Sequence, residues 1–578
     1  MSYNKAAWIA ALLAGTLLLA GCQNVQETQT TSAQTTKAST TESSSKLSLD
    51  TDDYYADISD AQQIQLNEQS GDVKITKAGT YQLSGVLQNG SVIVDAKDAV
   101  VRIVLDNANI QSKNSAPVYV KQAEKVIISL PKGTASTLKD SASYTVNAKE
   151  EPSAALFSKA DLTINGEGLL QIDASYKNGI QCKDTLKLVN ANLQITAEND
   201  GIKAKDELLI YKGSYHVTAQ GDGIVTTNEE KKGNLSIELG TFTIKTQQDG
   251  IQSAADLLIY DGSFTITSGG GSVNKVSSSS AQQPWGAFTD HDETSEKSQK
   301  GIKAGENLIL YQGSYTISAH DDALHANGNV EIRDGTYTLS SDDDGIHADD
   351  TLTVHKGSIE VKQSYEGLEG NTITLQGGNI SIQASDDGIN AAGELGNPLL
   401  TIDGGTIYVD ANGDGVDSNQ DIVMNDGTLV VMGPTGGGDG ALDYDGSFTM
   451  NGGNLLAAGS SDMAMAPSSS SKQVSLMINA DTVQSANTIL YIQDTDGKLI
   501  LGVSPAKSWQ NVVLSSSELS KGSTYEVYVG GTPAKVQNGV VTKANGGSKL
   551  TSLTVNDTIT LYGSGGMRGG GQGGGMHP

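Results

Sequence analysis

Acidic residues recur in this sequence at the spacing of a structural repeat, which makes them the first candidates for chemistry. Across the middle of the chain a carboxylate residue stands before a glycine, or before Ala323 in one repeat, about every 22 residues. If the repeats stack as parallel strands, equivalent residues lie about 4.8 Å apart. Two unit charges at that distance repel by roughly 3 kcal/mol at an effective dielectric constant of about 20. Such a column must be solvated, protonated or bridged by cations, and Ca²⁺, which takes about six to eight oxygen ligands, suits it.

The predicted calcium ligands are the acids of this column and their acidic neighbours. They are Asp200, Asp222, Asp249, Asp321, Asp322, Asp343, Asp344, Asp386, Asp387 and Asp414. Asp before Gly is also a common turn pair, in which the carboxylate bonds its own backbone, and this explains the recurrence equally well. A turn needs only one acid, whereas the central repeats carry two or three in succession. The doubled acids therefore favour calcium there, and isolated acids such as Asp200 and Asp222 leave both explanations open.

A second column consists of the polar residue three positions after the column acid of each repeat. We call it the stripe, and it is the predicted glycan-binding surface. The predicted contacts in it are Lys203, Lys303, His325, His347 and Asn390. On a flat parallel sheet these side chains could follow an extended polymer, with calcium bridging protein and uronate carboxylates. The alternative is an ordinary solvated surface, because exposed strand positions are polar in any case. The adjacent histidines could also bind a transition metal or be bystanders.

The elements that position both columns are short strands. Each unit, as in residues 200–221, contains three segments with apolar residues at every second position, separated by glycine columns. This periodicity is typical of strands and fits no helix. Three strands per repeat without a helical crossover predict an all-β parallel β-helix, with about twelve to thirteen rungs between residues 154 and 460. A leucine-rich repeat lacks its signature here, and a propeller needs about 40 residues per blade.

The N-terminus carries an export signal. Lys5, an apolar run and the sequence Leu-Ala-Gly-Cys at residues 19–22 resemble a bacterial lipoprotein signal, which makes Cys22 the predicted lipidation site. A plain secretory signal with a chance cysteine is the alternative, since the apolar run is too short to span a bilayer. We expect an exported protein, anchored by lipid at the bacterial cell envelope or surface.

The remaining chain divides by composition. The predicted segments are the signal 1–22, a Ser/Thr/Gln-rich tether 23–49, N-terminal rungs and cap 50–153, the regular β-helix 154–465 with an insertion at 269–299, a C-terminal β module 472–562 and a Gly-rich tail 563–578. Trp285 in the insertion could stack on a sugar ring, or it could be an incidental aromatic residue. Cys182 has no disulfide partner once Cys22 is lipidated, and we expect it to be buried.

Composition excludes several classes of protein. The chain has 578 residues, 67 glycines, 10 prolines and a net charge of −29. The glycine content is high, but prolines are few and the glycines do not recur every third residue, which excludes collagen and proline-rich disorder. The negative charge and the absence of a basic stripe argue against nucleic acid as a partner.

Several segments resemble a known family. TKAGTYQLSG at 76–85, LDNANI and SAPVYV within 105–120, and the repeated DGI-x-A array behind a lipobox are similar to the bacterial carbohydrate-binding right-handed β-helix lipoproteins. The resemblance spans about residues 50–560. It implies a right-handed parallel β-helix, calcium as cofactor, and binding of acidic plant polysaccharide such as polygalacturonate, and of cellulose. The fold also hosts pectate lyases, so the resemblance leaves the chemistry open.

The regular repetition favours a binding protein over an enzyme, and we predict no catalytic residue. A β-elimination lyase needs calcium and a strong base, for which only Lys203 and Lys303 are suitably placed. Hydrolysis needs one carboxylate pair in a distinctive environment, which repeated identical acids do not provide. We expect calcium-dependent polysaccharide binding, with membrane contact through the lipid alone. The alternatives are a calcium-dependent polysaccharide lyase and a structural adhesin or envelope protein; the oligomeric state is open.

Overall fold

The structure is a computed structural model that describes residues 46–55, 58–67, 71–145, 151–230, 232–273, 297–393 and 395–564. The predicted lipidation site Cys22, Trp285, and most of the insertion and the tail lie outside these residues. In the described ranges no helix is long and apolar enough to cross a membrane.

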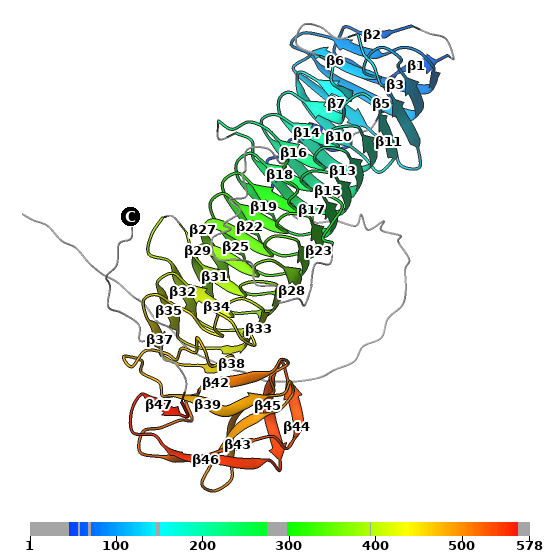
Figure 1. Cartoon of the computed structure of the whole chain (residues 1–578). Coiled ribbons are helices and arrows are strands. Elements are labelled where there is room, and N and C mark those ends of the chain that lie inside the picture. Colours follow the sequence, from blue (N-terminus) through cyan, green and yellow to red (C-terminus); the bar gives the residue numbers. More distant parts are fainter. Residues whose placement is uncertain are drawn as a thin grey trace, which may run out of the picture. The chain divides into compact units, whose positions relative to one another are not determined.

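The chain forms a parallel β-solenoid of about 16 turns, which confirms the prediction of an all-β right-handed parallel β-helix (Figure 1). There are more turns than predicted for the regular part alone, because residues 62–139 also form rungs. Each turn contributes one strand or strand segment to each of three faces. We call them the site face, the second face and the third face.

The site face contains the strands that carry the polar stripe. They are β2 (Val73–Ile75), β4 (Val92–Asp95), β6 (Val118–Gln122), β9 (Ala154–Ser158), β12 (Asn178–Cys182), β14 (Ile202–Ala204), β16 (Ile224–Thr226), β18 (Ile251–Ser253), β21 (Ile302–Ala304), β24 (Leu324–Ala326), the first halves of β27 (Ile346–Val354) and β29 (Leu368–Leu375), β31 (Ile389–Ala391) and β34 (Val416–Ser418). Their register is regular, with Lys303 paired to His325 and His325 paired to His347.

The second and third faces complete each turn. The second face contains β1 (Gln62–Leu66), β7 (Lys125–Ser129), β10 (Asp161–Asn165), β19 (Leu257–Ile259), β22 (Leu308–Leu310), β25 (Val330–Ile332), β32 (Leu399–Ile402), β35 (Asp421–Met424) and β37 (Phe448–Met450), with the second halves of β27 and β29. The third face contains β8 (Ala135–Lys139), β11 (Leu169–Ala174), β20 (Ser263–Ser268), β23 (Ser314–Ala319), β26 (Thr336–Ser341), β28 (Ser358–Ser364), β30 (Asn379–Ala384), β33 (Thr406–Ala411), β36 (Thr428–Met432) and β38 (Asn454–Gly459). Five long strands bend from the second face into the third: β3 (Gly79–Leu87), β5 (Val100–Gln111), β13 (Leu186–Ala197), β15 (Leu208–Ala219) and β17 (Leu235–Thr246).

The interior is filled by ladders of identical or similar side chains. Five aromatic residues of the third face, Tyr215, Phe242, Phe264, Tyr315 and Tyr337, stack with ring centroids 4.6–4.8 Å apart and are at most 1% exposed. These rings are core and cannot stack on a sugar. Cys182 is also buried, as predicted, and burial raises the pKa of its thiol to about 12.

The N-terminal strap, residues 46–55, lies along the solenoid and contains the short 3-10 helix η1 (Thr51–Asp53). Its anchor is Asp53, which is fully buried, with Lys125 Nζ at 2.6 Å and Lys187 Nζ at 2.9 Å. The Thr163 hydroxyl donates a further hydrogen bond to this carboxylate at 2.7 Å. Burial alone would raise the pKa of Asp53, but the two lysines outweigh it and lower the pKa to about 2.

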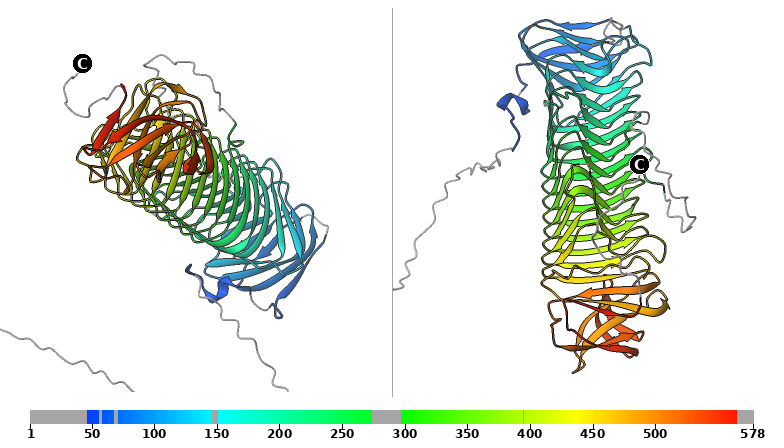
Figure 2. Two further views of the ribbon diagram at one scale, coloured as in Figure 1. Left: turned by 90° about the horizontal axis from the view of Figure 1, so that it is seen from below. Right: turned by 60° about the vertical axis from the view of Figure 1, so that its left-hand side comes forward.

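The C-terminal module ends the stack (Figure 2). Strands β39 (Ser475–Gln484), β42 (Trp509–Ser515) and β47 (Ile559–Tyr562) continue from the solenoid, and β42 pairs antiparallel with β38. This pairing covers an edge that would otherwise be open to aggregation. The remaining strands form a six-stranded antiparallel sheet: β40 (Leu490–Asp494), β41 (Leu499–Val503), β43 (Thr524–Val529), β44 (Thr532–Gln537), β45 (Val540–Asn545) and β46 (Ser548–Thr554).

Candidate functional site

The acids of the column lie one above another where each rung enters the site face, and they bond to the next rung. One carboxylate oxygen accepts a hydrogen bond from the backbone N–H of the equivalent residue one rung later. This occurs between Asp200 and Asp222 at 3.2 Å, Asp222 and Asp249 at 3.1 Å, Asp322 and Asp344 at 3.0 Å, and Asp387 and Asp414 at 2.6 Å. The turn explanation therefore needs correction, because these carboxylates link neighbouring rungs instead of bonding their own backbone.

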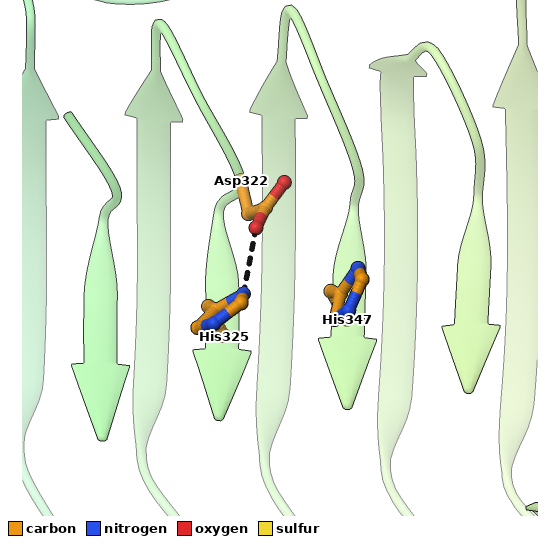
Figure 3. A group of neighbouring side chains, drawn as sticks. All are labelled: Asp322, His325 and His347. Carbon is orange, nitrogen blue, oxygen red and sulfur yellow. Dashed lines mark hydrogen bonds and ion pairs between the residues drawn. The ribbon is translucent and has the colours of Figure 1, made fainter. Parts of the chain in front are cut away.

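In three rungs the second carboxylate oxygen bonds to the stripe residue three positions later. Lys203 Nζ lies 2.6 Å from Asp200 Oδ2. His325 Nδ1 lies 2.8 Å from Asp322 Oδ2, and the ring of His347 stacks on that of His325 with centroids 5.0 Å apart (Figure 3). The same spacing brings His347 Nδ1 to 2.9 Å from Asp344 Oδ2. In these rungs both carboxylate oxygens are engaged within the protein.

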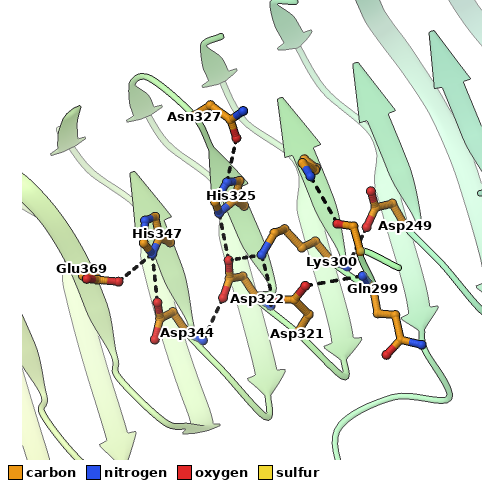
Figure 4. A network of polar contacts seen from close by, with 12 residues as sticks. Asp249, Gln299, Lys300, Asp321, Asp322, His325, Asn327, Asp344, His347 and Glu369 are labelled. Atoms are coloured by element: carbon orange, nitrogen blue, oxygen red, sulfur yellow. Dashed lines mark hydrogen bonds and ion pairs between the residues drawn. The ribbon is translucent and has the colours of Figure 1, made fainter. Parts of the chain in front are cut away.

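Lys300 supplies a cation inside the acid column (Figure 4). It occupies the column position before Gly301, and its Nζ lies 2.7 Å from both Asp321 Oδ1 and Asp322 Oδ2. Burial alone would raise the pKa of Asp322, but His325 and Lys300 lower it. The counter-ion of these two predicted calcium ligands is therefore a lysine, which the sequence analysis did not predict.

In the next rung no lysine forms an ion pair with Asp344 or Glu369 among the described residues, and His347 is surrounded by carboxylates. Its Nδ1 lies 2.6 Å from Glu369 Oε2 as well as close to Asp344, and its Nε2 lies 3.1 Å from Asp349 Oδ1. Burial alone would lower the pKa of His347, but the three carboxylates raise it above its usual value. Burial raises the pKa of Asp344 well above its usual value, and the neighbouring Asp322 and Glu369 add to this despite the opposing effect of His347.

Farther along the column lies a group that we call the acidic half: Glu366, Asp386, Asp387, Asp414 and Asp417. Among the described residues none of the five forms an ion pair with a lysine, arginine or histidine. Burial and neighbouring carboxyl groups raise the pKa of Glu366, Asp387 and Asp414 to about 8 each, and that of Asp417 to about 6. This part of the column lacks a built-in counter-ion.

The donor atoms of the acidic half fit a calcium ion. A Cβ atom on Gly413 would lie 2.4 Å from Asp386 Oδ1 and 2.5 Å from Asp387 Oδ1, so the glycine leaves space where two carboxylates converge. The amide oxygen of Asn390 is buried without a hydrogen-bond partner, while its Nδ2 donates to Glu366 Oε2 at 3.0 Å. Carboxylate and amide oxygens are the ligands that Ca²⁺ takes. Of the predicted calcium residues, Asp386, Asp387 and Asp414 have this environment.

The other predicted residues have different surroundings. Asp249 Oδ1 accepts the backbone N–H of Lys300 at 2.7 Å, and the Lys303 Nζ donates to Ser298 Oγ at 3.3 Å. Asp222 has a pKa raised to about 7 by burial and by its neighbours Asp249 and Asp200. Ligand atoms of Asp343, Asp321 and Asp322 lie within 4.8 Å of one another, beside Lys300.

A feature that sequence analysis missed lies at the N-terminal end of the stripe. A shallow cavity of about 640 Å³ is lined by Tyr119, Lys121, Glu151 and Lys159, among others. Tyr119 pairs with Phe157, and Phe157 pairs with Gln181. Gln181 in turn pairs with Lys203 of the stripe, so Tyr119 occupies the same register. The sequence SAPVYV contained this residue, but the irregular spacing of the first rungs concealed its register.

Known proteins are similar to much of the chain. A family model described as carbohydrate-binding domain-containing protein matches residues 69–345 and 340–499. A carbohydrate-binding domain-containing protein of Acetivibrio thermocellus is 34% identical over 200 residues, which cover 34% of this chain and 66% of that relative, slightly less than two thirds of its length. A solved structure described as a polysaccharide lyase-like protein from C. thermocellum, in a gadolinium derivative, is 32% identical over 36% of this chain and 90% of its own, with a TM-score of 0.34.

Proposed function

The chain belongs to the family of carbohydrate-binding domain-containing proteins, and from this premise we propose that its site face binds an extended, uronate-containing polysaccharide with calcium as a bridging cation. The observation that carries the proposal is the acidic half, a set of half-buried oxygen donors beside the site face that form no ion pair with any basic residue the structure describes. Calcium held there would provide positive charge for the carboxylates of an acidic glycan.

The rest of the stripe suits the same ligand. Lys203 and Lys303 lie on strands of the same face, and Lys121 and Lys159 line the cavity at its N-terminal end. Lysine ammonium groups can pair with uronate carboxylates directly. Tyr119 adds an aromatic ring of the kind that contacts the apolar side of a sugar. An acidic polymer along the stripe would meet lysines at one end and calcium at the other.

Binding is favoured over elimination by the contacts of the two lysines. A lyase base must be free to take a proton from the sugar. The Lys203 nitrogen donates to Asp200 at 2.6 Å, and the Lys303 nitrogen donates to Ser298 at 3.3 Å. We therefore propose a non-enzymatic protein. From the Leu-Ala-Gly-Cys sequence at residues 19–22 we propose that it is exported and attached to the cell envelope by a lipid on Cys22.

A glycan array with and without a chelator tests the function. We expect binding to polygalacturonate or related acidic glycans in calcium and loss of that binding in chelator. The double variant Asp387→Asn, Asp414→Asn should lose at least ten-fold in affinity, whereas Asp426→Asn, which changes an exposed acid in the turn between β35 and β36, should not. An array that stays blank in calcium would contradict carbohydrate binding and favour a structural adhesin.

A lyase assay separates binding from catalysis. Polygalacturonate incubated with calcium and the full chain should release no unsaturated product, measured by ultraviolet absorbance. Product formed by the natural chain but not by a Lys203→Ala, Lys303→Ala double variant would replace the binding proposal with a calcium-dependent lyase.

A further inference from the structure

His347 differs from its neighbour His325 in the groups around its imidazole ring. His325 shares Asp322 with the Lys300 ammonium, at 2.8 Å and 2.7 Å, and its Nε2 faces the amide oxygen of Asn327 at 2.9 Å. His347 has two carboxylates at Nδ1, those of Asp344 and Glu369 (Figure 4). A third carboxylate lies at its Nε2, and no lysine forms an ion pair with these carboxylates in the part of the chain that the structure describes. Two stacked rungs with the same histidine thus differ in whether a second cation is already present.

His347 and two neighbouring carboxylates each contribute one atom to a small triangle of candidate ligands. Its Nδ1 lies 2.9 Å from Asp344 Oδ2 and 2.6 Å from Glu369 Oε2, and all three donor atoms lie within 4.8 Å of one another. In an octahedral metal site with bonds of about 2.1 Å, adjacent ligand atoms are about 3.0 Å apart. The two measured sides, 2.6 and 2.9 Å, are shorter than this spacing and than the roughly 3.3 Å of a tetrahedral Zn²⁺ site, so the side chains would move apart by up to about 0.7 Å to admit the ion.

The β-helix register builds this triangle. Asp344 precedes β27, His347 lies on β27, and Glu369 is the residue paired with His347 on β29. The side chains of His347 and Glu369 are each 24% exposed, while that of Asp344 is 8% exposed. The ligands are thus held by packed backbone on one side and accessible to an ion from the other.

The remaining ring nitrogen is held as in many metal sites. A histidine that binds a metal commonly donates its other N–H to a carboxylate, which fixes the orientation of the ring. Asp349 Oδ1, at 3.1 Å from His347 Nε2, is placed for this role. His325 has a neutral amide at the equivalent place, so the complete set of two carboxylate ligands and one orienting carboxylate occurs at His347.

We propose that Asp344, His347 and Glu369 bind a divalent first-row transition metal such as Zn²⁺, with Asp349 as a positioning residue. An imidazole nitrogen beside carboxylates suits Zn²⁺, Mn²⁺ or Fe²⁺, whereas calcium takes oxygen ligands. The site therefore differs in chemistry from the oxygen donors of the acidic half. It also assigns Asp344, which the sequence pattern placed with calcium, to a different ion.

Isothermal titration of the full chain with Zn²⁺, in excess calcium and without a histidine tag, tests the site. We expect one strong binding event that His347→Gln abolishes. His325→Gln is the matched control from the preceding rung and should retain it. Asp349→Asn should weaken binding by about 10–100-fold, as loss of an orienting partner does elsewhere. Equal Zn²⁺ affinity in the natural chain and in His347→Gln, or equal loss in His325→Gln, would overturn the proposal.

A second measurement keeps the test decisive if His347→Gln does not fold. Co²⁺ added to the natural chain should give visible absorption bands typical of nitrogen and carboxylate ligands, unchanged by excess calcium and displaced by Zn²⁺. Displacement of Co²⁺ by calcium, or bands that Asp349→Asn leaves at full strength and affinity, would contradict the site. No glycan enters either experiment, so their failure and that of the proposed function are distinguishable.

Discussion

The rungs around Lys300 and the acidic half carry the same residue type in the same column but differ in counter-ion. At Asp322 a lysine and a histidine lower the pKa, whereas at Asp387 burial and neighbouring carboxyl groups raise it to about 8. The backbone is nearly equivalent, because each acid bonds the N–H of the next rung. The repeat thus sets where a carboxylate stands, and residues one rung away decide whether it needs an ion from solution.

Removal of the built-in cation should have the largest effect on stability. Lys300→Met leaves Asp321 and Asp322 without their ammonium partner, and breaking a buried ion pair costs about 3–5 kcal/mol. We expect a large drop in the thermal unfolding midpoint in chelator. Lys362→Met, which breaks an exposed pair with Glu360, is the control and should change stability by less than about 1 kcal/mol. Similar drops for both variants would mean that Lys300 is not the counter-ion of the column.

Neutralising an acid that has a lysine partner and an acid of the acidic half should have different effects on stability. Asp200→Asn loses a charged hydrogen bond to Lys203, worth about 1.5–3 kcal/mol, and should destabilise with or without calcium. Asp387→Asn removes a carboxyl group whose ionisation is opposed by its neighbours, so above about pH 8 it should be neutral or stabilising in chelator, and it should reduce the stabilisation that calcium gives. Thermal unfolding of both variants, in calcium and in chelator, measures this. Equal responses to calcium would contradict the distinction.

Stability in chelator should fall as the pH rises. Glu366, Asp387 and Asp414 have folded-state pKa values of about 8, above their unfolded values, so the folded chain holds more protons between about pH 4 and 8. Stability is then greatest at low pH within this range and is lost as the pH rises through about 8. We expect the unfolding midpoint in chelator to drop by several degrees from pH 6 to pH 9. Calcium should remove most of this drop; a midpoint that rises with pH would show that the acids are not buried together.

The fold was predictable because spacing alone encodes it. The 22-residue recurrence places Lys303, His325 and His347 in one stack, and the structure has this register. The role of Lys300 was not predicted, because the insertion before it stretched one spacing and only acids were considered for the column. The contact of the N-terminal strap with the solenoid was also not predictable, because Asp53 pairs with Lys125 and Lys187, which lie more than 70 residues away in the sequence. Periodicity predicts which residues share a column, but not which charges neutralise one another across rungs.

An engineered lysine should convert the acidic half into a copy of the Lys300 region, with the smallest effect on stability. Lys300 reaches Asp321 and Asp322 on the following rung, and Glu366 stands in the same relation to Asp386 and Asp387. The variant Glu366→Lys therefore places an ammonium group where we propose calcium, at the loss of the Asn390 hydrogen bond to Glu366.

We expect Glu366→Lys to stabilise the chain in chelator by about 1 kcal/mol, the upper range for a partly exposed ion pair. It should also weaken calcium binding, measured by titration, and flatten the pH dependence of the unfolding midpoint. Glu366→Gln is the matched control, because it removes the same carboxyl group without supplying a cation. If Glu366→Gln stabilised the chain as much as Glu366→Lys, relief of repulsion alone would explain the gain, and the acidic half would not need a counter-ion at that position.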